Sequence, residues 1–236
     1  MTTLHMLCAG AAQGLVKALQ AQFLADTGAT VQARFGAVGA MRQALLAGES
    51  CDLMLVTEAM IDSLVAEGRL QRDVHGATRA AIGSVRTGIA VQAGAPRPDV
   101  STPEALKAAL LAATAIYFPD ALRATAGIHF AKVMTALGIY DTLLPRFRTY
   151  PAGAIAMREM AAASGPGLIG CTQVTEINYT EGVDLVGVLP SRFELATVYT
   201  VAASATAAEP ALAQRFIALL SGPQSLALRA AGGFEF

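Results

Sequence analysis

The sequence predicts an α/β protein of two lobes, each a mainly parallel sheet flanked by helices. Three observations lead to this fold class. Short apolar strand patterns alternate with helical patterns along the chain, as in parallel sheets with helices on both faces. Residues 52–57 (DLMLVT) are apolar on both faces, which is typical of a central parallel strand. Glycines follow several predicted helices and give them C-terminal stop signals.

The first part of the chain predicts three strand–helix units. Leu15, Leu19 and Phe23 have the i, i+4, i+8 spacing of an amphipathic helix, and Gly28 follows as its stop signal. Strands are expected at residues 4–9, 30–35 and 52–57, and helices at residues 13–26, 38–46 and 58–67.

A second series begins near Gly83, and in it Thr102 and Pro103 are a candidate N-cap and first helical residue. Further strands are expected at 87–92, 115–118, 167–172, 183–189 and 195–202, and helices at 102–113, 127–137, 153–161, 209–220 and after 223. The chain crosses between the two series twice, near 82–88 and 190–198. We therefore expect a discontinuous first lobe (residues 1–82 plus 197–236) and a second lobe of residues 83–196.

Composition excludes several classes of protein. The 236 residues carry a formal net charge of −1 and are 54% hydrophobic, which is the reverse of a disordered chain. A nearly neutral chain makes nucleic acid a poor partner. Uncharged apolar-rich stretches such as residues 108–118 are shorter than the roughly 20 residues that cross a bilayer. We therefore expect no nucleic-acid partner and no direct insertion into a membrane.

The cysteines and histidines do not have the spacing of a metal site or a disulfide framework. The three cysteines are odd in number and far apart: Cys8, Cys51 and Cys171. The three histidines show no HxH or HExxH spacing: His5, His75 and His129. We expect neither a protein-bound metal nor another cofactor.

The N-terminus has no basic segment of the kind that begins a secretory signal, because the apolar residues begin directly as a strand. Two compartments stay open. The protein is periplasmic if the numbering starts after a removed signal, and cytoplasmic otherwise.

Four predicted strand–helix junctions consist of small residues, at 9–11, 36–39, 125–127 and 152–154. In parallel sheets ligands bind where strands end and helices begin. Small residues leave the backbone N–H groups at a helix N-terminus accessible, and these attract anions. The alternative is that the glycines only make tight turns. Four junctions at equivalent places favour an anion site.

The chain resembles the molybdate-binding-protein family, which has the type II periplasmic-binding-protein fold. The matching stretches are residues 9–23, 35–57 (FGAVGAMRQALLAGESCDLMLVT), 125–139 (TAGIHFAKVMTALGI) and 221–234 (SGPQSLALRAAGGF). The resemblance implies a two-lobed clamp with a two-strand hinge that closes on a small anion. It also implies the membrane component of an ABC transporter as a possible partner.

Three positions depart from this family's pattern. The resemblance places a serine in each of the first two loops and a tyrosine after a strand of the second lobe, where this chain has Ala11, Val38 and Cys171. Hydroxyl donors for a tetrahedral oxyanion are therefore missing, and an unpaired buried oxygen costs roughly 1–3 kcal/mol. An organic di- or tricarboxylate is a better expected ligand than molybdate, tungstate or sulfate, which stay as an alternative.

The loop at residues 119–125 supplies Arg123 and Thr125 beside a helix N-terminus, and a guanidinium suits a carboxylate. Arg34 and Arg42 are alternative cations, and each of these arginines could instead be solvated. Thr57 and Thr172 end strands and could donate hydroxyls. The candidate ligand-binding residues are Gly10, Ala11, Val38, Gly39, Arg123, Thr125, Ala126, Gly153 and Cys171.

Residues 90–118 resemble a subgroup of these proteins that includes bacterial aconitate isomerases, which act on a tricarboxylate. This resemblance implies an enzyme as the alternative to a binding protein. Such an isomerase needs a base and an acid to move a proton along an allylic system. Candidate residues are His129 and Cys171, followed by Tyr117 and Glu176. A packed helix histidine and a buried cysteine are the structural alternatives for the first two.

Overall fold

Strands and helices alternate along the chain in the computed structural model, which describes residues 2–73 and 76–236. The predicted α/β class is confirmed. The chain divides into unit 1 (Met1–Ser84, Thr197–Phe236) and unit 2 (Val85–Ala196). It passes from unit 1 to unit 2 within one long strand, β4 (Arg79–Gln92), and returns at β9 (Ala196–Ala203).

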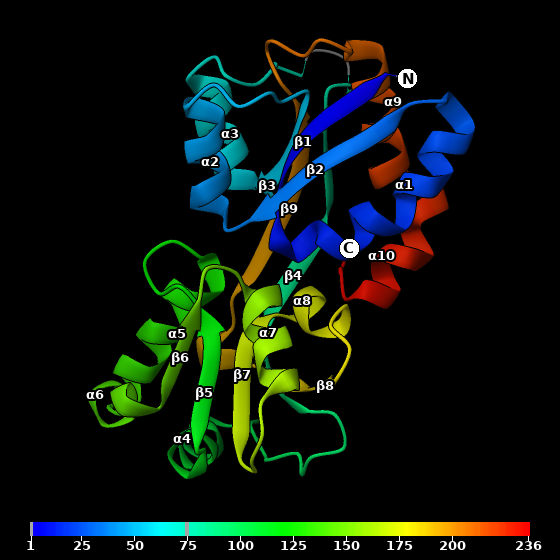
Figure 1. Ribbon diagram of the computed structural model, residues 1–236. Coiled ribbons are helices and arrows are strands. Elements are labelled where there is room, and N and C mark those ends of the chain that lie inside the picture. Colours follow the sequence, from blue (N-terminus) through cyan, green and yellow to red (C-terminus); the bar gives the residue numbers. More distant parts are fainter. Residues whose placement is uncertain (1, 74–75) are drawn as a thin grey trace. The chain divides into compact units, whose positions relative to one another are not determined.

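Unit 1 is built on a sheet with the strand order β2-β1-β3-β9 (Figure 1). Its strands are β1 (Thr3–Ala9), β2 (Thr30–Gly36), β3 (Leu53–Thr57) and β9. β1 is parallel to β2 and β3, whereas β9 is antiparallel to β3. The first four residues of β3 are fully buried, as the doubly apolar pattern at 52–57 predicted.

Helices cover both faces of this sheet (Figure 1). One face carries α2 (Val38–Leu46) and α3 (Glu58–Ala66), and the other carries α1 (Gln13–Thr27), α9 (Pro210–Ser221) and α10 (Leu226–Gly232). Short 3₁₀ segments, η1 (Gly10–Ala12) and η4 (Pro223–Ser225), precede α1 and α10. Gly28 ends α1 at φ +71°, and its N–H donates to the Leu24 carbonyl.

Unit 2 has the strand order β8-β4-β7-β5-β6. Its other strands are β5 (Ala115–Pro119), β6 (Phe147–Tyr150), β7 (Leu168–Gln173) and β8 (Val183–Val188). β5 is parallel to β6 and β7, while β4 is antiparallel to β7 and β8. The sheet is therefore mixed, with its parallel part at β6-β5-β7.

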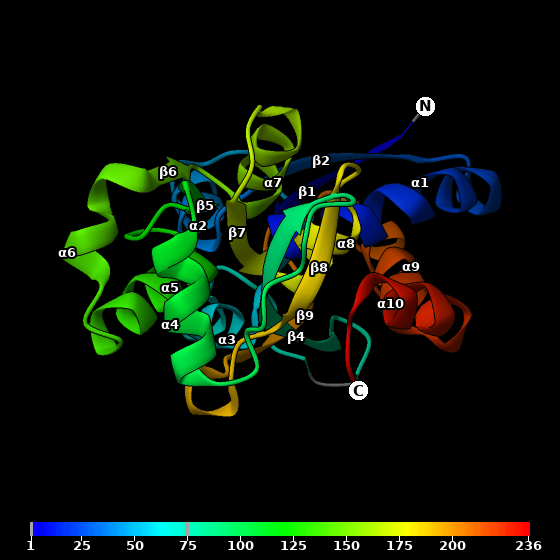
Figure 2. The same cartoon turned by 90° about the horizontal axis from the view of Figure 1, so that it is seen from below.

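Two apolar clusters fill the faces of the unit 2 sheet, because alternate residues of each strand point to opposite sides. One cluster packs against α4 (Pro103–Ala112), α5 (Thr125–Ala136) and α6 (Tyr140–Leu143), and the other against α7 (Gly153–Ala162) and α8 (Val174–Asn178). Figure 2 shows α7 and the α4–α5 pair on opposite sides of these strands. Short 3₁₀ segments, η2 (Leu144–Arg146) and η3 (Ser191–Phe193), follow α6 and β8. The predicted N-cap of α4 is confirmed, since the Thr102 hydroxyl accepts the Ala105 N–H at 3.1 Å.

Three elements differ from the sequence predictions for physical reasons. β6 was not expected, because its four residues (FRTY) are too few for a strand pattern and its central Arg148 is exposed. α8 has five residues, which is too short to show helical periodicity. β4 begins at Arg79 rather than at 87, since the strand continues through the boundary between the units.

Candidate functional site

The carboxyl ends of the three parallel strands in unit 1 lie side by side. In register, Ala9 of β1 pairs with Gly36 of β2, and Cys8 pairs with Leu55 of β3. η1 and α1 follow β1 at this edge, α2 follows β2, and α3 follows β3. The structure therefore brings the predicted junctions at 9–11 and 36–39 together at one edge of the unit 1 sheet.

The helices that begin at these two junctions lack the usual N-terminal caps. η1, α1 and α2 have no side-chain cap from the preceding residue and no acidic residue in the first turn. Ala11 and Val38 are buried (3% and 8% exposed), so their side chains pack in the core. Only their backbone N–H groups could bind an anion. Gly10 is buried and Gly39 is half-buried. The residues of these junctions bring backbone N–H groups rather than serine side chains, and the half-buried Thr57 ends β3 at the same edge.

The parallel strands of unit 2 form an equivalent edge. Pro119 at the end of β5 pairs with Tyr150 at the end of β6, and Tyr117 pairs with Gly170 of β7. α5 begins at Thr125, α7 at Gly153 and α8 at Val174, so three helices start beyond these strand ends. Neither α5 nor α7 has a side-chain cap from its preceding residue or an acidic residue in its first turn.

Asp120 shapes the loop that carries Arg123. Its Oδ1 accepts the backbone N–H groups of Leu122 at 2.7 Å and Arg123 at 3.2 Å, which makes an Asx turn. A Cβ on Gly127 would stand 2.2 Å from the Pro119 carbonyl oxygen, so this glycine lets α5 approach the loop closely. Sequence reasoning noted Asp120 only as a strand breaker. An Asp at the first position of a loop is the sequence signal that predicts such a turn.

The three candidate arginines differ in their partners. Arg42 on α2 binds both carboxylate oxygens of Glu67, at 3.0 and 3.2 Å, and Arg34 is paired with Glu49. Arg123 is exposed, and its guanidinium makes no hydrogen bond or ion pair with any residue that the structure describes. Arg123 is therefore the one of the three that is free to bind a ligand carboxylate.

Glu176 on α8 lies beneath the first turn of α7. Its carboxylate accepts the Thr172 hydroxyl and the backbone N–H groups of Ala154 and Gln173. Burial raises the pKa of this carboxyl, and the three hydrogen bonds oppose the rise. The bond from Gln173 is half of a capping box, with Gln173 at the N-cap of α8 and Glu176 three residues later. The α7 N-terminus, predicted to meet a ligand at Gly153, thus already has a carboxylate beside it.

Cys171 packs in the interior of unit 2. It is fully buried among the side chains of the α4–α5 face, because residues 169 and 171 of β7 point to that face and residues 170 and 172 point to α7. Burial raises the pKa of its thiol well above the ordinary value. This placement corrects the expectation that its side chain faces the ligand or serves as a base. The polar side chain at this strand end that points toward α7 belongs to Thr172.

His129 and Tyr117, two other candidate proton carriers, also have structural partners. The Nε2 of His129 lies 2.7 Å from the Phe193 carbonyl, to which it donates its proton. Tyr117 is buried against the α7 face and stacks on Tyr150 with ring centroids 6.2 Å apart. Their geometry favours packing roles, and Glu176 is the buried acid that stands at the strand-end edge.

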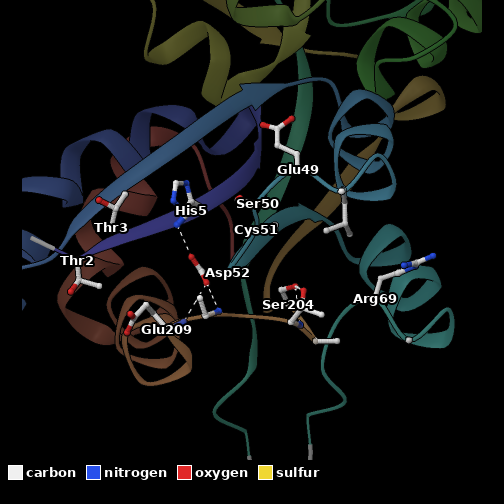
Figure 3. Close-up of a pocket in the computed structure, with 16 residues that line it drawn as sticks. Thr2, Thr3, His5, Glu49, Ser50, Cys51, Asp52, Arg69, Ser204 and Glu209 are labelled. Atoms are coloured by element: carbon white, nitrogen blue, oxygen red, sulfur yellow. Dashed lines mark hydrogen bonds between the residues drawn. The ribbon is translucent and has the colours of Figure 1, made fainter.

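Unit 1 has a polar pocket of about 850 Å³ at the opposite edge of its sheet, near the start of β1 (Figure 3). Asp52 at its floor accepts the His5 N–H at 2.8 Å through Oδ2 and the Ala208 N–H at 2.7 Å through Oδ1. Oδ1 also lies 3.4 Å from the Glu209 nitrogen, at the start of α9. The Asp52 carboxylate therefore links three chain segments: β1, the start of β3 and the start of α9. None of the predicted site residues lines the pocket.

The described residues contain no group of three or more His, Cys, Asp and Glu side chains that could hold a metal ion. In the described part of the chain, no helix is both long enough and apolar enough to cross a bilayer.

A mixed α/β fold with uncapped helix N-termini at its strand ends is typical of proteins that bind small anions. The family model described as "Bacterial extracellular solute-binding protein" matches residues 4–235, and the chain belongs to this family. The predicted membership of a solute-binding family with molybdate-binding relatives is thereby confirmed.

Individual proteins are similar to this chain in sequence or in structure. A Pseudomonas protein named aconitate isomerase is 25% identical over 227 residues, which cover 94% of this chain and 83% of that protein. The periplasmic molybdate-binding protein of Azotobacter vinelandii has a similar structure, with a TM-score of 0.80, 19% identity and 99% coverage of both chains. The sulfate-binding protein of Mycobacterium tuberculosis H37Rv has a TM-score of 0.75 and 19% identity, with 99% of this chain and 86% of that chain covered.

Proposed function

We propose that this solute-binding protein binds a small organic anion, a di- or tricarboxylate. The observation that carries the proposal is the set of uncapped helix N-termini at the carboxyl-end edges of both sheets, at α1 and α2 in unit 1 and at α5 in unit 2. Such ends stabilise negative charge without lysine or arginine side chains. This accounts for anion binding by a chain whose net charge is only −1.

The preference for a carboxylate over a tetrahedral oxyanion rests on side chains. Residues 11 and 38 are a buried alanine and valine, so two hydroxyl donors of the molybdate-binding pattern have no counterpart. The free guanidinium of Arg123 beside α5 has the planar, bidentate geometry that matches a carboxylate. Molybdate and sulfate, which the structural relatives are named for, are the competing ligands.

A panel of anions in a thermal-shift assay tests this proposal, because a ligand that binds only the native state raises Tm. The panel contains citrate, cis- and trans-aconitate, succinate, molybdate, tungstate and sulfate, with sodium chloride at matched ionic strength as control. We expect a concentration-dependent rise in Tm with a tricarboxylate. Stabilisation by molybdate or tungstate alone would contradict the carboxylate preference, and no stabilisation by any anion would contradict the function.

The second candidate function is an isomerase of the aconitate type, favoured by the Pseudomonas relative. The test is incubation of cis- or trans-aconitate with a high concentration of protein, followed by ultraviolet absorbance. Interconversion would establish the enzyme. Binding of aconitate without interconversion over hours would leave the binding protein as the function.

The proposal extends to partner, motion and compartment. We infer that the two units close on the ligand and that the membrane component of an ABC transporter receives it. We also infer that the protein works in the periplasm. The family description, which names extracellular solute-binding proteins, supports a place outside the cytoplasm. Small-angle scattering with and without a stabilising anion tests closure, with a smaller radius of gyration expected for the complex. An unchanged radius would contradict it.

A further inference from the structure

The Glu176 carboxyl occupies space that only a glycine at position 153 leaves open. A Cβ on Gly153 would stand 2.1 Å from Oε2 of Glu176 and 1.9 Å from Oγ1 of Thr172. These atoms therefore touch the backbone of the first residue of α7. An anion bound to the Gly153 N–H would be an immediate neighbour of this carboxyl.

Among the residues that the structure describes, the surroundings of Glu176 supply hydrogen-bond donors and no counter-ion. The Thr172 hydroxyl and two backbone N–H groups donate to the carboxylate, and no charged group contributes to the rise of its pKa. The charged side chains on the elements packed against α8 are directed elsewhere. On α7, Arg158 and Glu159 are exposed; on β8, Asp184 pairs with Arg97 at 3.3 Å; on β7, the Cys171 thiol faces the opposite side.

An anionic ligand beside the Glu176 carboxylate would put two negative charges close together, which is electrostatically unfavourable. Two like charges at short range raise the pKa of the group that can still accept a proton, and the effect is larger when both are shielded from water. Glu176 is 7% exposed, and a protonated carboxyl keeps acceptor capacity for the N–H groups that donate to it.

We propose that Glu176 couples binding of the anionic ligand to uptake of one proton. This inference rests on the proposed function. An anion held at the α5 N-terminus that also reaches the candidate residue Gly153 favours the protonated Glu176 carboxyl, so the protein takes up a proton as it binds. Affinity therefore falls as the pH rises, by up to about tenfold per pH unit.

Isothermal titration calorimetry of the wild-type protein with trans-aconitate tests the coupling directly. Titrations in two buffers of different ionisation enthalpy, at several values over about pH 5 to pH 8, give the number of protons taken up. Glu176→Gln removes the titrating group and keeps the shape of the side chain, and Glu159→Gln on the exposed face of α7 is the matched control. Thr172→Val removes the hydroxyl that stabilises the charged form and shifts the pH dependence upward. The proton balance of the free ligand is common to all variants and cancels in their comparison.

The expected result is proton uptake in the wild-type and Glu159→Gln proteins that is absent in Glu176→Gln, together with a flatter pH profile of affinity in that variant. Binding with the same proton uptake in Glu176→Gln would overturn the inference and leave the proposed function intact. Binding by the wild-type protein with no proton uptake beyond that of the ligand would overturn it even if Glu176→Gln fails to fold. If no anion binds the wild-type protein, the proposed function fails and the inference fails with it.

Discussion

The Asp52 carboxylate accepts the backbone N–H of Ala208 at 2.7 Å, across 156 residues of sequence. The same side chain accepts the His5 N–H at 2.8 Å through its other oxygen. One buried residue thus joins β1, the start of β3 and the start of α9, which come from both ends of the chain. A discontinuous unit 1 needs such long-range connections, because its two segments are separated in sequence by the whole of unit 2.

Asp52→Asn is expected to destabilise the protein by about 2–3 kcal/mol, since an amide nitrogen would face backbone donors in place of a carboxylate oxygen. Urea unfolding measures this loss. Asp141→Asn, at an exposed position on α6, is the matched control and is expected to change the free energy of unfolding by less than about 0.5 kcal/mol. Equal effects of the two substitutions would show that the Asp52 network carries no special stability.

Gly127 is expected to tolerate no side chain. A Cβ there would lie 2.2 Å from the Pro119 carbonyl oxygen and 2.4 Å from that of Asp120. Backbone atoms cannot relieve such a clash by a rotamer change, as a side chain can. Gly127→Ala should therefore cost about 1–3 kcal/mol and displace the loop that carries Arg123. Gly187→Ala is the control, because its Cβ would lie 3.6 Å from Val100, an ordinary contact. Thermal unfolding and anion titration compare the two, and a Gly127→Ala protein with wild-type Tm and affinity would contradict the close approach.

Stability is expected to depend on pH through Glu176. Its pKa is raised in the folded protein by burial, so the folded state holds the proton more tightly than the unfolded state. The stabilising contribution is complete below the unfolded-state pKa and is lost as the pH rises through the folded-state value. The free energy of unfolding should fall with pH by at most about 1.4 kcal/mol per unit, and less steeply in Glu176→Gln. Urea unfolding over about pH 5 to pH 8 measures both slopes, and parallel curves would refute the assignment.

Much of the fold could be predicted from the sequence, because the information is local. The spacing of Leu15, Leu19 and Phe23 with Gly28 behind it predicted α1, whose observed bounds are Gln13–Thr27. Short elements such as β6 and α8 were missed, since four or five residues cannot display a period.

The candidate site was only partly predictable, because side-chain direction depends on register. The sequence predicted a strand end at 171–172. Successive side chains of a strand point to opposite faces, so that of Cys171 packs in the core and that of Thr172 points to α7. The partner of Ala154 at the α7 N-terminus comes from α8, more than twenty residues later. No local sequence pattern predicts a contact between α7 and α8. The spacing of Gln173 and Glu176, which is that of a capping box, predicts only the bond within α8.

The three cysteines are expected to be unreactive in the folded protein. All are buried, and burial raises the thiol pKa of Cys51 to about 12 and raises those of Cys8 and Cys171 well above the ordinary value. The thiolate is the reactive form, so its absence suppresses attack on a disulfide reagent. Titration with Ellman's reagent should count no fast-reacting thiol in buffer and three in denaturant. A fast thiol in buffer would place one cysteine at an accessible surface.

The central claim is that an anion binds at the strand-end edges with Arg123 as its guanidinium partner. Calorimetric titration of Arg123→Ala tests this claim most directly, with the anion that most stabilises the wild-type protein as titrant. Arg42→Ala, which breaks a surface pair with Glu67, is the control. We predict that Arg123→Ala lowers affinity at least about tenfold, or 1.4 kcal/mol, with an unchanged Tm in the absence of ligand, and that Arg42→Ala keeps wild-type affinity. Unchanged affinity in a well-folded Arg123→Ala protein would contradict the account.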